Sequence, residues 1–196
     1  MALCHLGTDE ALSIIDPQST RAMLMKFKTG GFRQPTGDDR PNTYDDPSLV
    51  HTAEPGSFVV CDNGEMDMRG CYCAMVVADV LGLLPDEELT SGIAEFIASC
   101  QTYEGGIASI PYGEGHAGYT FCGLATLVIL KRTDLIDLHS LANWLAHRQL
   151  KVEGGFNGRI NKLVDSCYNF WLGGTAELLD IAMEGECNVD KEWIIN

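Results

Sequence analysis

The chain has 196 residues, of which 45% are hydrophobic and 21% charged, enough apolar material for a globular core. Its 28 acidic and 13 basic side chains give a net charge of −15, which argues against nucleic acid or an anionic membrane as the main partner. No secretory signal opens the chain and no apolar stretch is long enough to span a membrane, so we expect a cytoplasmic protein whose eight cysteines are reduced, buried thiols.

A repeat of about fifty residues organises the chain. Gly-Gly followed by an apolar residue occurs at 105–107 and 154–156, and a related Gly-Ser-Phe occurs at 56–58, always 49 residues apart. Each unit then has a polar stretch, an apolar helical run and an amphipathic helix. A helix that is apolar all round is buried on both sides, so the pattern predicts an all-α fold of alternating inner and outer helices.

The expected elements follow in chain order. They are an inner and an outer helix over 1–15 and 17–28, then inner helices over 70–83, 119–131 and 166–181 alternating with outer helices over 89–100 and 138–148. Residues 33–55, rich in Pro, Asp, Gly and Thr, follow a Gly-Gly-Phe turn at 30–32 and predict a loop insertion, with disorder or an unusual splice as alternatives. The helical pattern has no cap at either end, so we interpret 1–196 as a single, incomplete domain.

Polar residues recur near the start of the inner helices. Counting from the first glycine of each turn, position 11 holds Asp67, His116 and Asp165, and position 13 holds Arg69, Gly118 and Cys167. In a ring of stacked helix pairs, equal positions lie at equal height. The residues therefore form one layer at helix N-termini, where unpaired N–H groups and the helix dipole favour anions.

Aromatic residues recur one helical turn deeper. Positions 16 and 17 hold Tyr72, Phe121, Phe170, Cys73, Cys122 and Trp171. Aromatic residues at helical spacing usually belong to the core. Combined with the polar layer, they predict a cavity with an anion-attracting rim and an apolar floor, which suits an amphiphile with an anionic head.

Asp165 and Cys167 begin the third of these inner helices. Two residues apart, they can share a ligand only if Asp165 precedes the helix as its N-cap, and capping alone is the alternative role. The helix dipole is expected to lower the pKa of the Cys167 thiol, and a carboxylate with a thiolate supplies two of the three ligands of a catalytic zinc. None of the histidines is clearly placed as the third ligand; they are His5, His51, His116, His139 and His147.

Arg159 and Lys162 precede the same helix in a glycine-rich approach. With His116 they could bind a phosphate or diphosphate, Arg159 as a bidentate fork and Lys162 as a point charge. Solubility at the surface is the alternative role for both.

Three stretches make the chain similar to a known family. They are QTYEGG at 101–106, GHAGYTFCGLA at 115–125 and EGGFNGRINKLVDSCY at 153–168. They resemble the protein prenyltransferase β subunits, and the resemblance covers nearly all of the chain outside 33–55. The glutamate before Gly-Gly-Phe and the Asn-Lys-Leu-Val-Asp run favour members that transfer a farnesyl group over the type I geranylgeranyl members. The implied fold is a partial α/α toroid of the terpenoid cyclase and prenyltransferase kind, and a cyclase is disfavoured because no acidic cyclase motif is present.

The resemblance implies transfer of a farnesyl group from farnesyl diphosphate to the cysteine of a C-terminal CaaX motif, in a heterodimer with an α subunit. By position, Asp165 and Cys167 would be two zinc ligands. Diphosphate binding and leaving-group stabilisation would fall to His116, Arg159, Lys162 and Tyr168. The isoprenoid and peptide would be bound by Arg69, Tyr72, Gly118, Tyr119, Cys122 and Trp171.

The chain also departs from the family pattern. The family takes its third zinc ligand, a histidine, and an acidic residue associated with magnesium from segments that this chain lacks, and its ring has six helix pairs. This chain supplies four inner and three outer helices. We therefore expect a truncated β subunit that is weakly active or inactive alone, with Zn²⁺ and Mg²⁺ as cofactors of the full-length enzyme. A non-catalytic form that only binds the α subunit is the alternative.

Overall fold

The computed structural model describes residues 8, 13–29, 56–61 and 64–184, which form helices and the turns between them. The helices are α3 (Pro17–Phe27), α4 (Met68–Val80), α5 (Glu87–Thr90), α6 (Ile93–Ser99), α7 (Ala117–Leu130), the 3-10 helix η1 (Thr133–Leu135), α8 (Leu138–Ala146) and α9 (Cys167–Glu184). Within this part of the chain, β pairing is limited to isolated bridges, and no helix is long and apolar enough to cross a membrane. The all-α class is confirmed.

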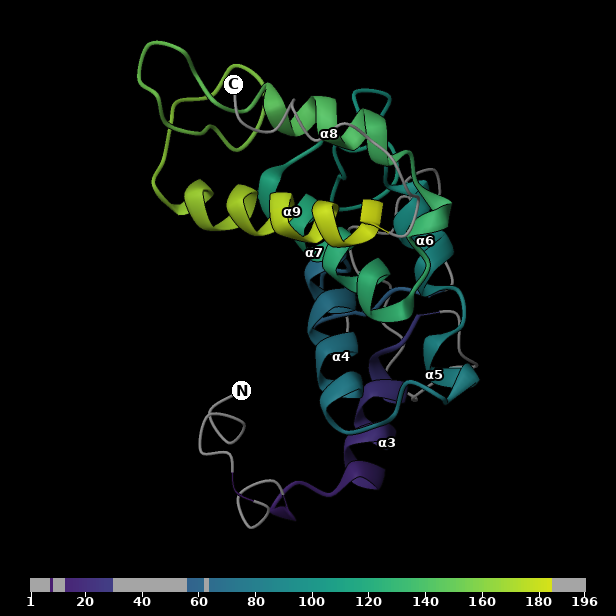
Figure 1. The fold of residues 1–196 in the computed structure, drawn as a ribbon. Coiled ribbons are helices and arrows are strands. Elements are labelled where there is room, and N and C mark those ends of the chain that lie inside the picture. The colour runs from purple at the N-terminus through teal and green to yellow at the C-terminus, as the bar shows by residue number, and fades with distance from the viewer. Residues whose placement is uncertain (1–7, 9–12, 30–55, 62–63, 185–196) are drawn as a thin grey trace.

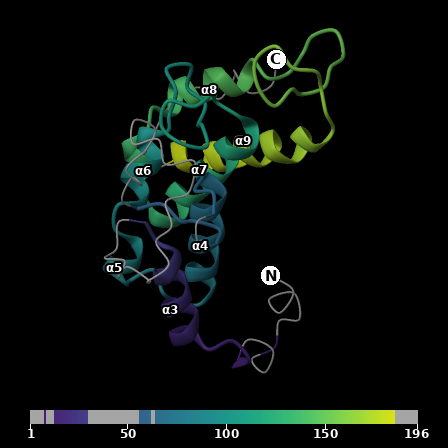
Figure 2. The ribbon, with the colours of Figure 1, turned by 180° about the vertical axis from the view of Figure 1, so that it is seen from behind.

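The helices form two layers. The inner helices α4, α7 and α9 stack in sequence, with α7 between the other two, and α5, α6 and α8 lie along the other side (Figure 1). The same order is visible from behind (Figure 2). Because α7 is covered on both flanks, its Thr120, Leu124 and Leu127 are completely buried. The outer helices bury one face each, through residues such as Ile97 of α6 and Leu141 of α8.

Glycine turns connect each outer helix to the next inner helix. Gly56, Gly105 and Gly154 have φ values of 99°, 104° and 69°, a region that favours glycine. At Gly105 a Cβ atom would also lie 2.0 Å from the carbonyl oxygen of Ser140 in α8. Backbone conformation and close packing therefore both explain why glycine recurs at this spacing.

Backbone hydrogen bonds fasten each inner helix to the next turn. The Met68 N–H at the start of α4 donates to the Ser109 carbonyl at 3.1 Å, and the Ala117 N–H at the start of α7 donates to the Gly158 carbonyl at 2.8 Å. Donor and acceptor are both displaced by 49 residues between the two bonds. The repeat seen in the sequence is therefore a structural repeat.

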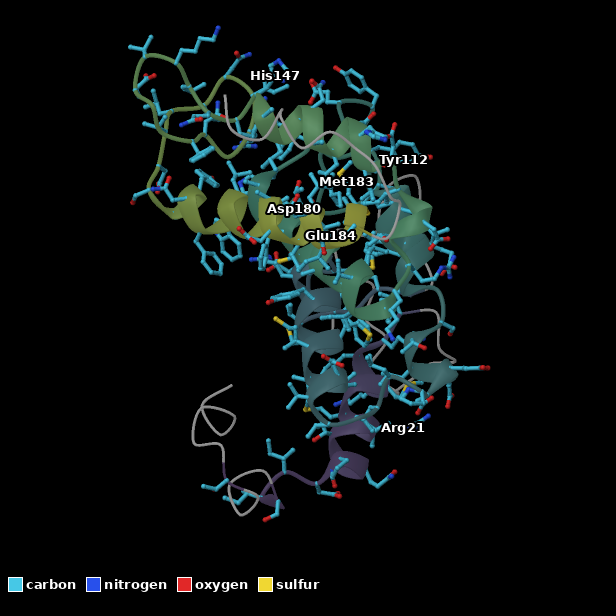
Figure 3. All side chains as sticks on the ribbon, viewed as in Figure 1. Arg21, Tyr112, His147, Asp180, Met183 and Glu184 are labelled. Atoms are coloured by element: carbon cyan, nitrogen blue, oxygen red, sulfur yellow. The ribbon has the colours of Figure 1, made fainter. Side chains whose placement is uncertain are left out.

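An ion-pair cluster joins α3 to the adjacent outer segment. Arg21, labelled in Figure 3, lies on α3. It donates to the Glu88 carboxylate at 2.7 Å and also to Asp86, the N-cap of α5. Lys28, which follows α3, donates to the Ser91 hydroxyl at 3.1 Å. The first described helix is thus held by side chains from a segment about sixty residues later.

Most of the element predictions are confirmed, with ends that shift by up to three residues. The single outer helix expected over 89–100 is wrong, because Ser91 and Gly92 separate α5 from α6 and Gly92 has a φ of 77°. The remaining expectations concern a helix over 1–15, a turn at 30–32 and an insertion over 33–55. They fall wholly or mostly outside the described residues and stay predictions, as does the extent of the domain.

The cysteines follow the expected burial only in part. Cys71, Cys100 and Cys122 are buried, whereas Cys61, Cys73 and Cys167 are exposed, so the expected burial is wrong for these last three. Residues two positions apart in an α-helix point to nearly opposite sides. Because Cys71 faces the core, Cys73 faces outward. The six cysteines in the described segments are free thiols.

Candidate functional site

The layer predicted at the inner-helix N-termini is present. In each inner helix, the residue at register position 11 accepts a hydrogen bond from the backbone N–H two residues later. The bonds run from Arg69 to Asp67 at 2.8 Å, from Gly118 to His116 Nδ1 at 3.1 Å and from Cys167 to Asp165 at 2.9 Å. These side chains therefore lie at the same end of the three helices, which we call the rim.

His116 and Tyr168 form a pair across two repeats of the rim. The Tyr168 hydroxyl lies 3.2 Å from His116 Nε2, and the rings meet edge to face with centroids 5.7 Å apart. Because Nδ1 accepts the Gly118 N–H, the neutral ring carries its proton on Nε2, which donates to the Tyr168 oxygen. The Tyr168 proton is then free to donate to a ligand.

Burial keeps the His116 imidazole neutral and the Tyr168 phenol protonated. Burial lowers the pKa of His116, and the positive charge of Arg159 lowers it further, so the imidazole is neutral near pH 7. Burial raises the pKa of Tyr168, which keeps the phenol protonated. The pair therefore presents one hydrogen-bond donor without a positive charge of its own.

Arg159 is held beside this pair. Its Nη1 donates to the Glu114 carboxylate at 2.8 Å, and both side chains are partly exposed. Sequence reasoning did not select Glu114, although an acidic residue two positions before His116 is a usable signal for a partner of a scarce cation. Lys162 has an exposed side chain, and its backbone carbonyl accepts from Asn157 Nδ2 at 3.2 Å. The expected diphosphate contact of Lys162 stays a prediction.

Arg69 extends the rim onto the preceding repeat. Its Nε lies 3.1 and 3.0 Å from the two oxygens of Asp67, a buried carboxylate, and its guanidinium is 6.0 Å from the Tyr119 ring centroid. The Tyr119 ring is in turn 5.2 Å from the His116 ring. Arg69, Tyr119 and His116 thus form one row, and Asp67 fixes the cation at its end.

An aromatic cluster lies one turn deeper, as the register predicts. Phe121 of α7 is at its centre, and the ring centroids of Tyr72, Phe170 and Trp171 lie 5.6, 5.5 and 5.5 Å from that of Phe121. Burial raises the pKa of the neighbouring Cys122 to about 12, so this buried thiol is a neutral, apolar group beneath the cluster. We call this cluster the floor.

Asp165 and Cys167 fit part of a metal site. Asp165 precedes α9, as a shared ligand requires, and its carboxylate accepts from the backbone N–H of Cys167 at 2.9 Å. The bond holds the carboxylate at the helix end where Cys167 begins α9. The expected lowering of the Cys167 pKa is wrong, because the hydrogen bond to the adjacent Asp165 carboxylate raises it more than the helix end lowers it.

The third ligand is not supplied by the described residues. Residues 8, 13–29, 56–61 and 64–184 contain no group of three His, Cys, Asp or Glu side chains that could hold a metal ion. His139 and His147 belong to the outer helix α8 and its C-cap and are exposed, while His5 and His51 lie outside the described segments.

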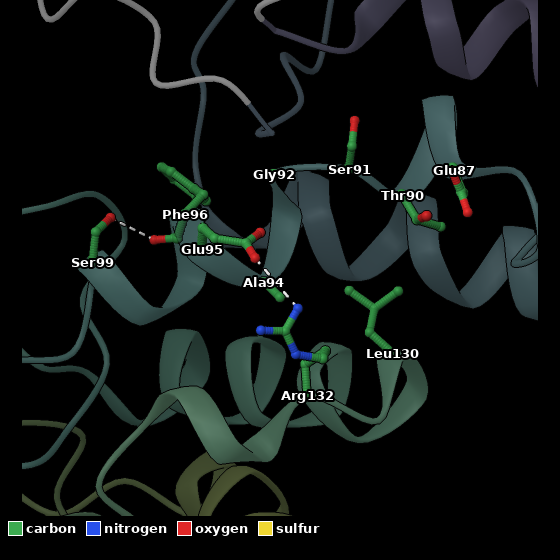
Figure 4. Close-up of a pocket in the computed structure, with 10 residues that line it drawn as sticks. All are labelled: Glu87, Thr90, Ser91, Gly92, Ala94, Glu95, Phe96, Ser99, Leu130 and Arg132. Carbon is green, nitrogen blue, oxygen red and sulfur yellow. Dashed lines mark hydrogen bonds and ion pairs between the residues drawn. The ribbon is translucent and has the colours of Figure 1, made fainter.

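A separate pocket lies on the outer side of the molecule. It has a volume of about 680 Å³ between α5, α6 and the end of α7, and a contact of 3.3 Å joins Arg132 to Glu95 across it (Figure 4). Its lining shares no residue with the rim or the floor. The predicted site is thus on the inner helices, away from this pocket.

Comparisons with known proteins agree with these features. The family model described as the prenyltransferase alpha-alpha toroid domain matches residues 1–196. The chain is 44% identical over 180 residues to the protein farnesyltransferase subunit beta of Arabidopsis thaliana, covering 91% of this chain and 32% of that protein. It is 52% identical over 124 residues to the same subunit of Pisum sativum, covering 63% of this chain and 29% of that protein.

A solved structure is also similar. It is the Candida albicans protein geranylgeranyltransferase-I complexed with GGPP, which is 29% identical with a TM-score of 0.56 over 72% of this chain and 45% of that chain. The chain therefore spans about a third of the length of the curated relatives and just under half of the solved one.

Proposed function

Because the chain belongs to the prenyltransferase alpha-alpha toroid family, we propose that it forms part of the β subunit of a protein farnesyltransferase. The same match establishes the fold as a portion of an α/α toroid. In the proposed reaction, the sulfur of a CaaX cysteine bonds to C1 of farnesyl diphosphate while the C1–O bond breaks. Diphosphate leaves with the bonding electrons, and the cysteine proton is released.

The observation that carries this proposal is the placement of the rim directly above the floor. The Tyr168 hydroxyl and the Arg159 guanidinium suit a diphosphate, and the Phe121 cluster one turn deeper suits an isoprenoid chain. Identities of 44% and 52% to two farnesyltransferase β subunits favour the farnesyl group.

Each rim residue has a distinct task in this proposal. The Tyr168 hydroxyl donates a hydrogen bond to an oxygen of the departing diphosphate, while Arg159 neutralises the negative charge that grows there. His116 orients the Tyr168 hydroxyl through its Nε2–H. We assign Arg69, which Asp67 holds, to the carboxylate at the end of the CaaX peptide.

Zinc is the proposed metal, with Asp165 and Cys167 as two of its ligands. The hydrogen bond from the Cys167 N–H to the Asp165 carboxylate, which holds the two residues at one helix end, supports this pairing. When bound, zinc would supply a Lewis acid that keeps the acceptor cysteine as a thiolate. We further propose that the full-length protein supplies a histidine as third ligand, uses Mg²⁺, pairs with an α subunit and works in the cytoplasm.

A second candidate is a non-catalytic form that only binds the α subunit. It is favoured by the exposure of the floor, since the Phe170 side chain on α9 is 64% exposed to water. A type I geranylgeranyltransferase β subunit is the alternative within the enzyme class, and the similar solved structure belongs to it.

The test compares full-length protein, assembled with the α subunit, with its Cys167→Ala variant in a transfer assay on a fluorescent CaaX peptide. We expect transfer from farnesyl diphosphate in preference to geranylgeranyl diphosphate, and loss of transfer in the variant without loss of α-subunit binding. Cys61→Ala, which removes an exposed cysteine outside the rim, is the matched control. Absence of transfer by the unaltered, assembled protein would contradict the enzyme proposal, and undiminished transfer by Cys167→Ala would contradict the zinc-ligand role of Cys167. A zinc-bound, active 196-residue chain would contradict the expectation that this segment is inactive alone.

A further inference from the structure

The aromatic ring of Tyr168 rests on the backbone of Gly158. A Cβ atom at Gly158 would lie 2.0 Å from Cζ and 2.3 Å from the hydroxyl oxygen of Tyr168, far inside any tolerated contact. Gly158 is not among the glycines with positive φ, so its backbone conformation is open to other residues. What requires glycine here is the space taken by the Tyr168 ring.

Hydrogen bonds hold the backbones of both partners in this contact. The Gly158 carbonyl accepts from Ala117 N at 2.8 Å, and the preceding Asn157 N–H donates to the Arg148 carbonyl at 3.0 Å. The backbone of Tyr168 is fixed by its bond to the Asp165 carbonyl at 3.1 Å. The ring is thus confined between Gly158 and the His116 ring.

The preceding repeat shows that this turn does not need glycine. Ser109 is the equivalent of Gly158, and its carbonyl makes the equivalent bond to Met68 at 3.1 Å. Tyr119 is the equivalent of Tyr168, and it faces Arg69 and His116. The backbone at this position of the turn therefore accommodates a residue with a side chain. Glycine occurs in the repeat whose tyrosine, Tyr168, pairs with His116.

We infer that Gly158 is a positioning residue of the rim, because the space left by its missing side chain sets the Tyr168 hydroxyl against His116 and toward the departing diphosphate. The catalytic consequence rests on the proposed function, whereas the geometric consequence does not. An added methyl group displaces the Tyr168 ring, since the free end of a side chain moves more easily than the fastened backbone.

The kinetic test uses full-length protein with its α subunit and four variants, which are Gly158→Ala, Tyr168→Phe, the double variant and Gly173→Ala. We expect the first two to lower kcat by similar factors, about tenfold to a hundredfold, with little change in the KM of the CaaX peptide. The double variant should be no slower than the slower single variant. Gly173→Ala is the control, because a Cβ there meets nothing within 4 Å. If the factor by which kcat falls in the double variant equals the product of the two single-variant factors, the inference would be overturned.

A second measurement separates the inference from the proposed function. The ¹⁵N resonance of His116 Nε2 reports its hydrogen bond to Tyr168 whether or not the protein transfers a prenyl group. We expect Gly158→Ala and Tyr168→Phe to shift this resonance alike and Gly173→Ala to leave it in place. An unchanged resonance in Gly158→Ala would overturn the positioning role. A shifted resonance in a protein without transfer activity would support that role and contradict the proposed function.

Discussion

His116 uses its two ring nitrogens for different tasks. Nδ1 caps α7 by accepting from Gly118, and Nε2 faces the hydroxyl of Tyr168. Asp67 and Asp165 cap α4 and α9 from the same register position with carboxylates. A third carboxylate could cap α7 equally well but would repel an anionic leaving group, and a neutral imidazole avoids that repulsion.

The lowered pKa of His116 predicts how its titration affects stability. In the unfolded chain the imidazole titrates near pH 6.5, whereas burial keeps the folded imidazole neutral to lower pH. Between about pH 7 and pH 5.5 the unfolded state therefore binds more protons, and acidification favours unfolding. His116→Asn keeps a capping oxygen and removes this titration, so its free energy of unfolding, measured in urea, should fall less over that range. An equal or larger fall in the variant would contradict the assignment.

Tyr112 occupies the third position of a β-turn in a conformation suited to glycine. The Gly113 N–H donates to Ile110 at 3.2 Å, Tyr112 has a φ of 65°, and its side chain lies fully exposed at the edge of the molecule (Figure 3). This type II turn normally takes glycine there. Tyr112→Gly should raise the free energy of unfolding by about 1 kcal/mol, because the strain disappears and no buried contact is lost.

Asn161 provides the matched control for Tyr112. It is the equivalent residue in the next repeat and has a φ of 57°. Asparagine tolerates this conformation better than tyrosine does, so Asn161→Gly should gain less in the same urea-unfolding experiment. A larger gain at Asn161 than at Tyr112 would show that strain is not the cause.

The spacing of the repeat predicts site residues that recur at equal positions. It misses residues whose role depends on a single contact between two separate segments. Asp67, His116 and Asp165 follow from equal spacing, and Tyr168 follows only from the family resemblance. Glu114 and Gly158 act through segments that only the fold brings together, at Arg159 and Tyr168. The predicted direction of the Cys167 pKa was wrong for a different reason, because the carboxylate two residues earlier raises this pKa more than the helix end lowers it.

Each inner helix within the described residues 64–184 is present as one unbroken helix, as the sequence predicts. An apolar run long enough for a helix has one stable place in a layered all-α fold, which is between two neighbours, and α7 occupies it. The break between α5 and α6 is different, because Gly92 adopts its φ of 77° where Gly56 packs against it. A contact between residues 36 positions apart leaves no local pattern in the sequence.

The outer helix α8 depends on a cap that can be tested. The Asp137 carboxylate accepts from the Ser140 N–H at 2.9 Å and from the Ser140 hydroxyl at 2.6 Å. Asp137→Ala should lower the free energy of unfolding by about 1 kcal/mol, since two donors lose their acceptor. Glu177→Ala removes an exposed carboxylate inside α9 and should change it by less than about 0.5 kcal/mol. Equal effects would show that the capping bond contributes little.

The whole molecule carries a strongly negative net charge, and the two rim cations are matched by carboxylates. Against a net charge of −15, Arg69 is paired with Glu65 and Asp67, and Arg159 is paired with Glu114. The summed field of the molecule therefore repels anions. Anion binding at the rim depends on placed donors, such as the Tyr168 hydroxyl and the two guanidinium groups, and not on a local excess of positive charge.

The same net charge predicts that salt stabilises the folded chain. Folding brings 28 acidic side chains closer together, and raising NaCl from about 0.01 M to about 0.1 M shortens the Debye length from about 30 Å to about 10 Å. The urea midpoint at pH 7 should therefore rise with salt, because exposed pairs such as Arg159–Glu114 are individually worth too little to reverse the trend. Near pH 4.5, the isoelectric point, the rise should shrink because net repulsion disappears. A midpoint that falls with salt at pH 7 would show that ion pairs outweigh the repulsion.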